Sequence, residues 1–319
     1  MSAQEGKGAI FASLAANLGI AAAKFVAFLI TGASSMLAEA VHSVADSSNQ
    51  VLLLIGGRRS RREPTQAHPF GYGRAHFLYA FIVSIVLFTL GGLFAINESI
   101  HKMQHPEMIQ APLVAYVVLA AAIVFEGLAL RTVLREARSF KPKNQGWIKF
   151  LRQTKSVNHV VLALEDSAAL LGLVFAAVGI TLALITGNPL WDAIGTMLIG
   201  VLLVTVAVVL FAEVKSLLIG EAVDSSTESK MRRLIESVDG VDRLVDLKTL
   251  YVGPLELFVA MKVTVPERNS AKVVAETIDL IEVELRHAFP IARLIYIEPD
   301  IYKTPEQQQR DDERHAKSV

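Results

Sequence analysis

Six long apolar segments dominate the first two thirds of the chain. Each has about 20 residues or more, enough to cross a bilayer core of roughly 30 Å. They lie at residues 8–31, 34–57, 77–101, 111–131, 158–186 and 190–213. Backbone N–H and C=O groups in lipid must be paired within the spanning segment, so each segment is expected to be helical. The sequence therefore predicts an α-helical membrane protein with six transmembrane helices.

Basic residues predict how these helices are oriented. The loop after the second segment carries five arginines between Arg58 and Arg74, and the loop after the fourth carries eight basic residues between Arg131 and Lys155. The opposite loops hold few, and Lys102 is the main exception. Because Lys and Arg concentrate in cytoplasmic loops, both chain termini are predicted to be cytoplasmic. The first apolar run follows MSAQEGKG without a cleavage signature, so we expect a retained span.

The sequence changes character near residue 220. An amphipathic helical pattern is followed by two strand patterns joined at Gly253-Pro254, a second helical pattern and a third strand pattern. We therefore expect a transmembrane domain at 1–219 and a cytoplasmic α+β domain of ferredoxin-like α-β-β-α-β order at 220–303. The polar residues 304–319 are expected to form a disordered tail.

Two of the apolar segments carry ionisable side chains well inside their ends. His42 and Asp46 are four residues apart, so a helix places them on one face, and Glu39 and Gln50 extend this stripe. Glu165 and Asp166 enter the fifth segment. Ionisable groups at bilayer depth are costly and tend to mark the paths of ions.

The two acidic clusters are predicted to lie at the same depth. Asp46 precedes Arg58 by 12 residues and Asp166 follows Lys155 by 11, which corresponds to roughly 18 Å and 17 Å of helix. An imidazole with carboxylates suits Zn²⁺, and also Mn²⁺, Fe²⁺ or Co²⁺. The alternative is that these groups only hydrogen-bond across helices. The matched depth of two clusters favours an ion site.

Two further charges fall within the apolar segments. Lys24 either extends its ammonium toward the membrane surface or pairs with a carboxylate such as Glu39. Glu126 precedes Arg131 by five residues, so we expect it to reach the membrane interface. We assign neither residue to the ion site.

The composition excludes several classes of protein and site. A formal net charge of zero argues against nucleic-acid binding. The chain has no cysteine, which excludes disulfides and thiolate metal ligands. We expect no prosthetic group. The expected partners are the lipid bilayer, a divalent cation, protons and a second copy of the chain.

Two motifs and the order of elements resemble those of a known family. The second segment contains H-S-x-x-D (His42, Ser43, Asp46), and HPFGYGR follows it at residues 68–74. Over residues 8–303 the chain resembles the cation diffusion facilitator (CDF) family of divalent-metal/proton exchangers. The sequences EDSAALLG and LLIGEA resemble the branch that contains mitochondrial-type zinc exporters.

The resemblance implies a tetrahedral metal site between the second and fifth helices, each of which supplies two ligands four residues apart. His42 and Asp46 match in the second helix, and Asp166 matches in the fifth. Leu162 stands at the remaining position and cannot bind a metal, so Glu165 is the substitute. The expected metal ligands are thus His42, Asp46, Asp166 and Glu165, with His159 on the entry path.

Other metal sites of the family are not expected here. His68 remains from a loop site, but Thr65 and Tyr72 fill its other positions. In the cytoplasmic domain, the family's metal-binding positions hold Lys262, Val274, Tyr296 and Glu298. A dimer of this domain would then be held by packing rather than by metal.

These observations predict a homodimeric secondary transporter in the plasma membrane of a bacterium. It would export a divalent cation, with Zn²⁺ as the expected cargo and Mn²⁺, Fe²⁺ or Co²⁺ as alternatives, in exchange for protons. Metal and proton would compete for the same atoms. One rival is a membrane metalloenzyme, although no HExxH motif is present. Another is a non-transporting partner protein, which Leu162 favours and the retention of His42, Asp46 and Asp166 opposes.

Overall fold

The computed structural model describes residues 3–140 and 157–301. It divides into two compact units, which we describe separately. The first comprises the chain up to Glu63 together with Arg74–Leu218. The second comprises Pro64–Gly73 and the chain from Ile219 onward. The predicted tail at 304–319 and part of the second basic loop lie outside the described residues.

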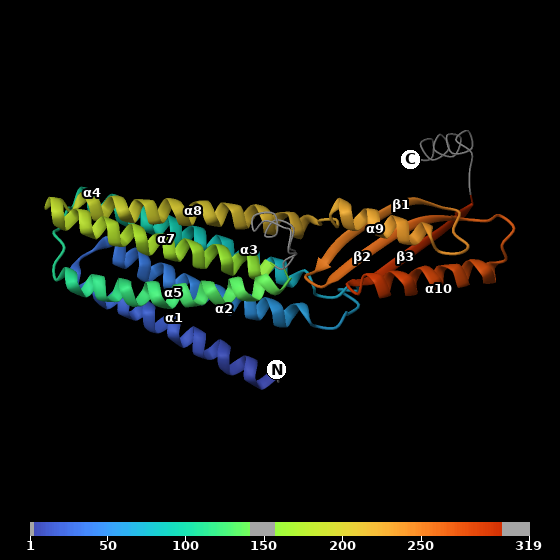
Figure 1. The fold of residues 1–319 in the computed structure, drawn as a ribbon, viewed down its shortest axis with the longest axis horizontal. Coiled ribbons are helices and arrows are strands. Elements are labelled where there is room, and N and C mark those ends of the chain that lie inside the picture. Colours follow the sequence, from blue (N-terminus) through green and yellow to red (C-terminus); the bar gives the residue numbers. More distant parts are fainter. Residues whose placement is uncertain (1–2, 141–156, 302–319) are drawn as a thin grey trace. The chain divides into compact units, whose positions relative to one another are not determined.

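Long helices running side by side make up the first unit (Figure 1). A single helical segment comprises α3, a π-helical turn (η1) and α4, and the other helices are uninterrupted. Their bounds are α1 Ala3–Thr31, α2 Ser34–Ser60, α3 Ala75–Val86, η1 Leu87–Leu93, α4 Phe94–Gln104, α5 Pro112–Phe140, α7 Val157–Thr186 and α8 Leu190–Ile219.

Five helical segments of the described chain are long and apolar enough to cross a membrane. They cover Leu14–Thr31, Ala75–Gln104, Pro112–Arg135, Leu162–Thr186 and Leu190–Ile219. Helix α2 is equally long but more polar, because it carries Glu39, His42 and Asp46. It packs against α1, α3, η1, α4 and α7, so its polar side chains are kept from lipid. The predicted six-helix transmembrane architecture is confirmed.

Side chains from other helices fix the tight turn between α1 and α2. Ala33 precedes α2 and cannot cap it, so Asp192 of α8 accepts hydrogen bonds from the Ser34 N–H (2.8 Å) and the Ser35 hydroxyl. A carboxylate at a helix N-terminus also complements the helix dipole. Lys102 donates to the Gly32 carbonyl at 2.7 Å. Lys102, the main basic residue outside the predicted cytoplasmic loops, thus has a structural role.

Glycines allow close contact between the helices of this unit. A Cβ atom on Gly200 of α8 would lie 2.9 Å from the backbone nitrogen of Ile96 and 3.1 Å from the Gly92 carbonyl oxygen. A Cβ atom on Gly179 of α7 would lie 3.3 Å from the Cα atom of Gly195 in α8. Small residues at membrane helix contacts let the backbones approach and increase van der Waals packing.

The second unit has the predicted α-β-β-α-β order. Strands β1 and β2 are antiparallel, β2 and β3 are parallel, and the sheet order is β1-β2-β3. Helix α10 packs against β3 and α9, and α9 packs against β1. The bounds are α9 Ser225–Glu236, β1 Arg243–Gly253, β2 Glu256–Val265, α10 Ala271–Ala288 and β3 Ala292–Ile301.

The loop that links α2 to α3 belongs to this second unit. It contains the HPFGYG part of the HPFGYGR motif. The ring of Phe70 packs edge-on against that of Phe258 in β2, with centroids 5.9 Å apart. A Cβ atom on Gly73 would collide with the Val252 carbonyl oxygen and lie 3.0 Å from the Cα atom of Gly253. Only glycine fits this contact with the end of β1.

Gly200→Ala is expected to destabilise the helical unit by about 1–3 kcal/mol, because the added methyl group meets backbone atoms that cannot move independently. Thermal unfolding of the purified protein in detergent measures the effect. The matched control is Gly19→Ala in α1, where the added methyl group meets nothing within 4 Å. Equal melting temperatures for the two variants would contradict the close packing at Gly200.

Asp224→Ala is expected to destabilise α9 by about 1 kcal/mol at neutral pH. The Asp224 carboxylate caps this helix through the Ser226 and Thr227 N–H groups and the Thr227 hydroxyl, and the hydroxyl hydrogen bond is the main cause that lowers the pKa of Asp224. Because the folded-state pKa is depressed, the stabilisation exists above the ordinary pKa and is lost as pH falls through the folded-state value.

Hydrogen exchange of the α9 amides measures this difference in the full chain. A loss of about 1 kcal/mol corresponds to roughly fivefold weaker protection. The exposed Asp279→Asn in α10 is the control and should leave α9 unchanged. If the protection of the α9 amides still differed between wild type and Asp224→Ala at acid pH, the cap would not depend on the carboxylate charge.

Candidate metal-binding site

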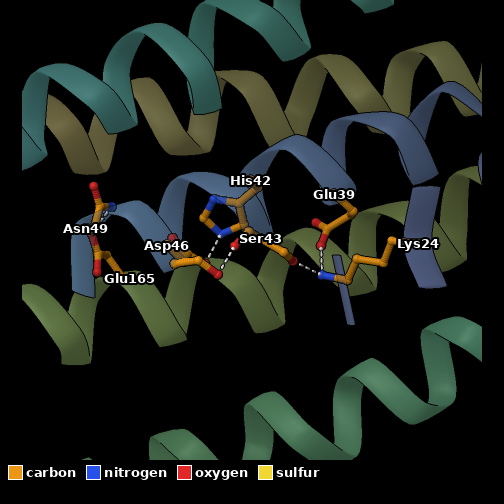
Figure 2. A network of polar contacts seen from close by, with 8 residues as sticks. Lys24, Glu39, His42, Ser43, Asp46, Asn49 and Glu165 are labelled. Carbon is orange, nitrogen blue, oxygen red and sulfur yellow. Dashed lines mark hydrogen bonds and ion pairs between the residues drawn. The ribbon is translucent and has the colours of Figure 1, made fainter. Parts of the chain in front are cut away.

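Helix α2 buries a row of polar side chains along one face. Glu39 and Asn49 are fully buried, His42 is 1% exposed, and Asp46 lies between His42 and Asn49 along the helix. Spacings of three and four residues place these side chains on one side of a helix. Figure 2 shows the row, with Lys24 of α1 and Glu165 of α7 meeting it from neighbouring helices. Their enclosure among helices avoids the cost of exposing them to lipid.

His42 and Asp46 are the centre of this row. Their Nε2 and Oδ2 atoms are 3.4 Å apart. Both ring nitrogens of His42 and the Oδ1 atom of Asp46 are buried without a hydrogen-bond partner in the described structure. Buried polar atoms are normally hydrogen-bonded, so such unsatisfied atoms require an explanation. A bound cation would satisfy the Asp46 oxygen and the one ring nitrogen of neutral His42 that carries a lone pair, because both are electron-pair donors suited to a divalent metal.

Glu165 and Asp166 approach the row from α7. Glu165 is buried and accepts a hydrogen bond of 2.8 Å from the Asn49 side-chain amide. Both carboxyl groups of α7 interact electrostatically with Asp46. The structure therefore brings Asp46, Glu165 and Asp166 into one cluster.

Asn49 is a member of the cluster that sequence reasoning missed. The predicted stripe ended at Gln50, whereas the residue that meets Glu165 is Asn49. Asn49 lies three residues after Asp46, and a spacing of three serves a helix face as well as a spacing of four. The three-residue spacing from Asp46 was therefore the sequence feature that could have indicated Asn49.

The cluster is not a closed coordination shell in this structure. Within residues 3–140 and 157–301, no three His, Asp or Glu side chains stand close enough together to hold a metal ion. Binding would require the side chains from α2 and α7 to draw together. His159, expected on the entry path, lies in the first turn of α7, and its side chain lies outside the described part of the structure.

Lys24 of α1 reaches α2 at Glu39 and Ser43, next to the His42–Asp46 pair. It is fully buried, and its ammonium group is 2.9 Å from Oε2 of Glu39 and 2.9 Å from the Ser43 hydroxyl. Of the two alternatives for Lys24, the structure selects pairing with Glu39. Gly172 of α7 leaves room for this pair, because a Cβ atom there would lie 2.6 Å from Oε1 of Glu39.

Glu126 of α5 also faces the cluster. Its carboxyl group interacts electrostatically with Lys24, Asp46, His42 and Glu39. Its depth relative to the membrane interface stays a prediction, but the half-buried side chain interacts with the charged groups of the cluster as well. The number of residues between Glu126 and Arg131 gives the depth of Glu126 along α5. The direction in which its side chain points depends instead on how α5 is rotated about its own axis.

At the two further positions where no metal site was expected, the residues contact one another. The exposed His68 ring lies on the ring of Tyr72, with centroids 4.5 Å apart, and the Tyr72 hydroxyl is 3.2 Å from that of Thr65. In the sheet, the Lys262 ammonium lies 3.0 Å from Asp300 and 3.1 Å from Glu298. These two carboxylates raise the pKa of Lys262, with Asp300 contributing most.

Two family models match the sequence. The cation efflux transmembrane domain matches residues 10–219, and the cytoplasmic domain of cation efflux proteins matches residues 223–300.

Several curated proteins are similar to the chain. The mitochondrial proton-coupled zinc antiporter SLC30A9 of Xenopus laevis is 34% identical over 231 residues, 72% of this chain and 41% of that protein. Metal tolerance protein C4 of Arabidopsis thaliana is 30% identical, covering 79% of this chain and 55% of that protein. Manganese efflux system protein MneS of Bacillus subtilis is 28% identical, covering 78% and 80%. The chain thus spans about two fifths of the length of the first relatives.

Lys24→Met is expected to destabilise the protein by about 3–5 kcal/mol, because it leaves the Glu39 carboxylate buried without its cation. Glu39→Gln should have a similar effect by leaving Lys24 unpaired. The double variant Lys24→Met, Glu39→Gln should recover much of the loss, since neither charge then remains buried alone. Melting temperatures of the three variants in detergent measure this, and additive losses would contradict a direct ion pair.

Proposed function

Because the chain belongs to the cation efflux family, we propose that it is a secondary transporter that moves a divalent metal cation across a membrane in exchange for protons. The family assignment rests on the match over residues 10–219. It agrees with the CDF resemblance predicted from the H-S-x-x-D and HPFGYGR motifs.

The unsatisfied buried atoms of His42 and Asp46 are the observation that carries this proposal. They lie midway along a helix enclosed by other helices, and carboxyl groups from α7 face them. We propose His42, Asp46 and Asp166 as ligands of the transported cation, with Glu165 as a fourth. Imidazole nitrogen and carboxylate oxygens together suit Zn²⁺ and its neighbours in the first transition row.

The same ligand atoms account for coupling to protons. A histidine nitrogen or a carboxylate oxygen binds either a proton or a metal ion, so loading one releases the other. Rocking of helices around a site near the middle of the membrane would expose it alternately to the two sides. A high metal concentration on one side of the membrane and a high proton concentration on the other would then drive exchange.

Zn²⁺ is the proposed cargo, and efflux from the cytoplasm is the proposed direction. The name of the Xenopus relative supports zinc and protons, whereas the name of the Bacillus relative keeps Mn²⁺ as the second candidate. The basic loops support cytoplasmic termini. A homodimer is part of the proposal, and a bacterial plasma membrane stays a prediction from the sequence.

A non-transporting partner protein is the second candidate function, and Leu162 favours it. The family pattern would place a metal ligand where this leucine stands, so one coordinate bond is missing from the expected set. The retained His42, Asp46 and Asp166 favour transport instead. Measured metal flux separates the two.

In liposomes loaded with a pH-sensitive dye, the purified protein is expected to exchange external Zn²⁺ for internal protons. Asp46→Asn and Asp166→Asn should each reduce the flux to the level of empty liposomes, because each removes an anionic ligand from a low-dielectric site. The control is Glu213→Gln, an exposed acid on α8, which should retain the wild-type flux.

Mn²⁺, Fe²⁺ and Co²⁺ are tested in the same liposomes, and the cation giving the fastest flux identifies the cargo. Absence of flux with all four metals would overturn the transporter in favour of the partner protein.

A further inference from the structure

The inward face of α5 carries an acid that the proposed site does not yet use. Ala115, Leu119 and Ala122 are all buried along this face, and Glu126 follows Ala122 by four residues. A spacing of four keeps Glu126 on the same side of the helix. Helix α5 packs against α1 and α7. The acid is therefore directed between the helices that carry Lys24 and Asp166.

The charges around Glu126 place it inside the cluster. Lys24 is the charged group that influences Glu126 most, followed by Asp46, His42 and Glu39. In turn, Glu126 is the charged group that influences Asp166 most, ahead of Asp46. Glu126 thus interacts with acids of both α2 and α7, the two helices whose ligands would share a cation.

Negative charge in the cluster exceeds the positive charge that the protein supplies. Glu39, Asp46, Glu126, Glu165 and Asp166 contribute five carboxyl groups, and Lys24 contributes one ammonium group. That ammonium already lies 2.9 Å from Glu39 and from Ser43. Several buried carboxyl groups are not stable as anions without a further cation nearby.

A second observation, which concerns unpaired atoms rather than the balance of charge, also indicates a missing ligand. Both ring nitrogens of His42, which is 1% exposed, lack hydrogen-bond partners, as does Oδ1 of Asp46. Glu165 is engaged by the Asn49 amide, so its first oxygen is already satisfied. Leu162 supplies no donor. The site therefore has unpaired electron-pair donors, and its expected ligand set lacks the one that Leu162 cannot supply.

We propose that Glu126 is a further ligand of the transported cation, which is then held between three helices, α2, α5 and α7. This inference rests on the proposed function and extends it. Added to His42, Asp46, Asp166 and Glu165, Glu126 makes the ligand set one imidazole with four carboxylates. Oxygen-rich sets of this kind accept Mn²⁺, Fe²⁺ and Co²⁺ more readily than a closed tetrahedral shell of nitrogen ligands does. Glu126 would thereby help to determine which metals are carried.

Titration of the full chain in detergent with Co²⁺ tests the proposal. The visible absorption of Co²⁺ reports its coordination, and competition with Zn²⁺ and Mn²⁺ gives their relative affinities. Glu126→Gln keeps the shape of the side chain and is expected to weaken Co²⁺ binding by about 10–100-fold, comparable to the loss of a supporting group at other metal sites. It should also change the Co²⁺ spectrum. Glu213→Gln should bind within about twofold of wild type, because that side chain is exposed.

The outcomes separate this proposal from the function on which it rests. If Asp46→Asn abolishes Co²⁺ binding and Glu126→Gln leaves affinity and spectrum unchanged, Glu126 is not a ligand and the proposed function stands. If Glu126→Gln lowers only the melting temperature, Glu126 is a counter-charge for Lys24 and the proposal is overturned. If wild type binds no metal, the proposed function itself fails. Should Glu126→Gln not fold, Glu126→Asp, which shortens the carboxylate by one methylene, is expected to bind Co²⁺ more weakly with an altered spectrum.

Discussion

The cost of ionisable side chains at bilayer depth is the constraint on which the helical unit depends. Helix α2 carries Glu39, His42 and Asp46 through the apolar region, and each would be strongly unfavourable against lipid. The helix is therefore enclosed by its neighbours, and its most buried charge is neutralised by Lys24 at 2.9 Å. The enclosure that protects these groups also forms the low-dielectric surroundings in which a cation would be bound tightly.

Close helix contact is what makes that enclosure possible. Glycines at the contacts of α7 and α8 with their neighbours bring backbones within van der Waals distance. Gly172 leaves the space that the Glu39 carboxylate occupies. Beyond the same end of the polar row, the carboxylate of Asp192 holds the start of α2. Small residues and a few buried hydrogen bonds thus set the position of α2, and with it the position of His42 and Asp46.

Much of the fold could be predicted because its signals are local. The six apolar runs and the α-β-β-α-β pattern each arise from residues adjacent in sequence, and the helices and strands lie close to the expected ranges. The sequence left two alternatives for the Lys24 ammonium group, the membrane surface or an ion pair. It could not decide between them, because the partner of Lys24 lies on another helix. The interactions of Asn49 with Glu165 and of Glu126 with the cluster were missed for the same reason. Their roles depend on which way a helix is rotated, and depth along the sequence carries no information about that rotation.

The membrane-spanning segments could be located from the amino-acid sequence, and the spacing of acids in two of them predicts a matched depth. Both follow from hydropathy and residue spacing, which act along a single helix. The pairing of Lys24 with Glu39, the hydrogen bond from Asn49 to Glu165 and the interaction of Glu126 with the cluster became visible only in the folded chain. Each of these depends on contacts between helices that are distant in sequence, where packing selects the face that each helix turns inward.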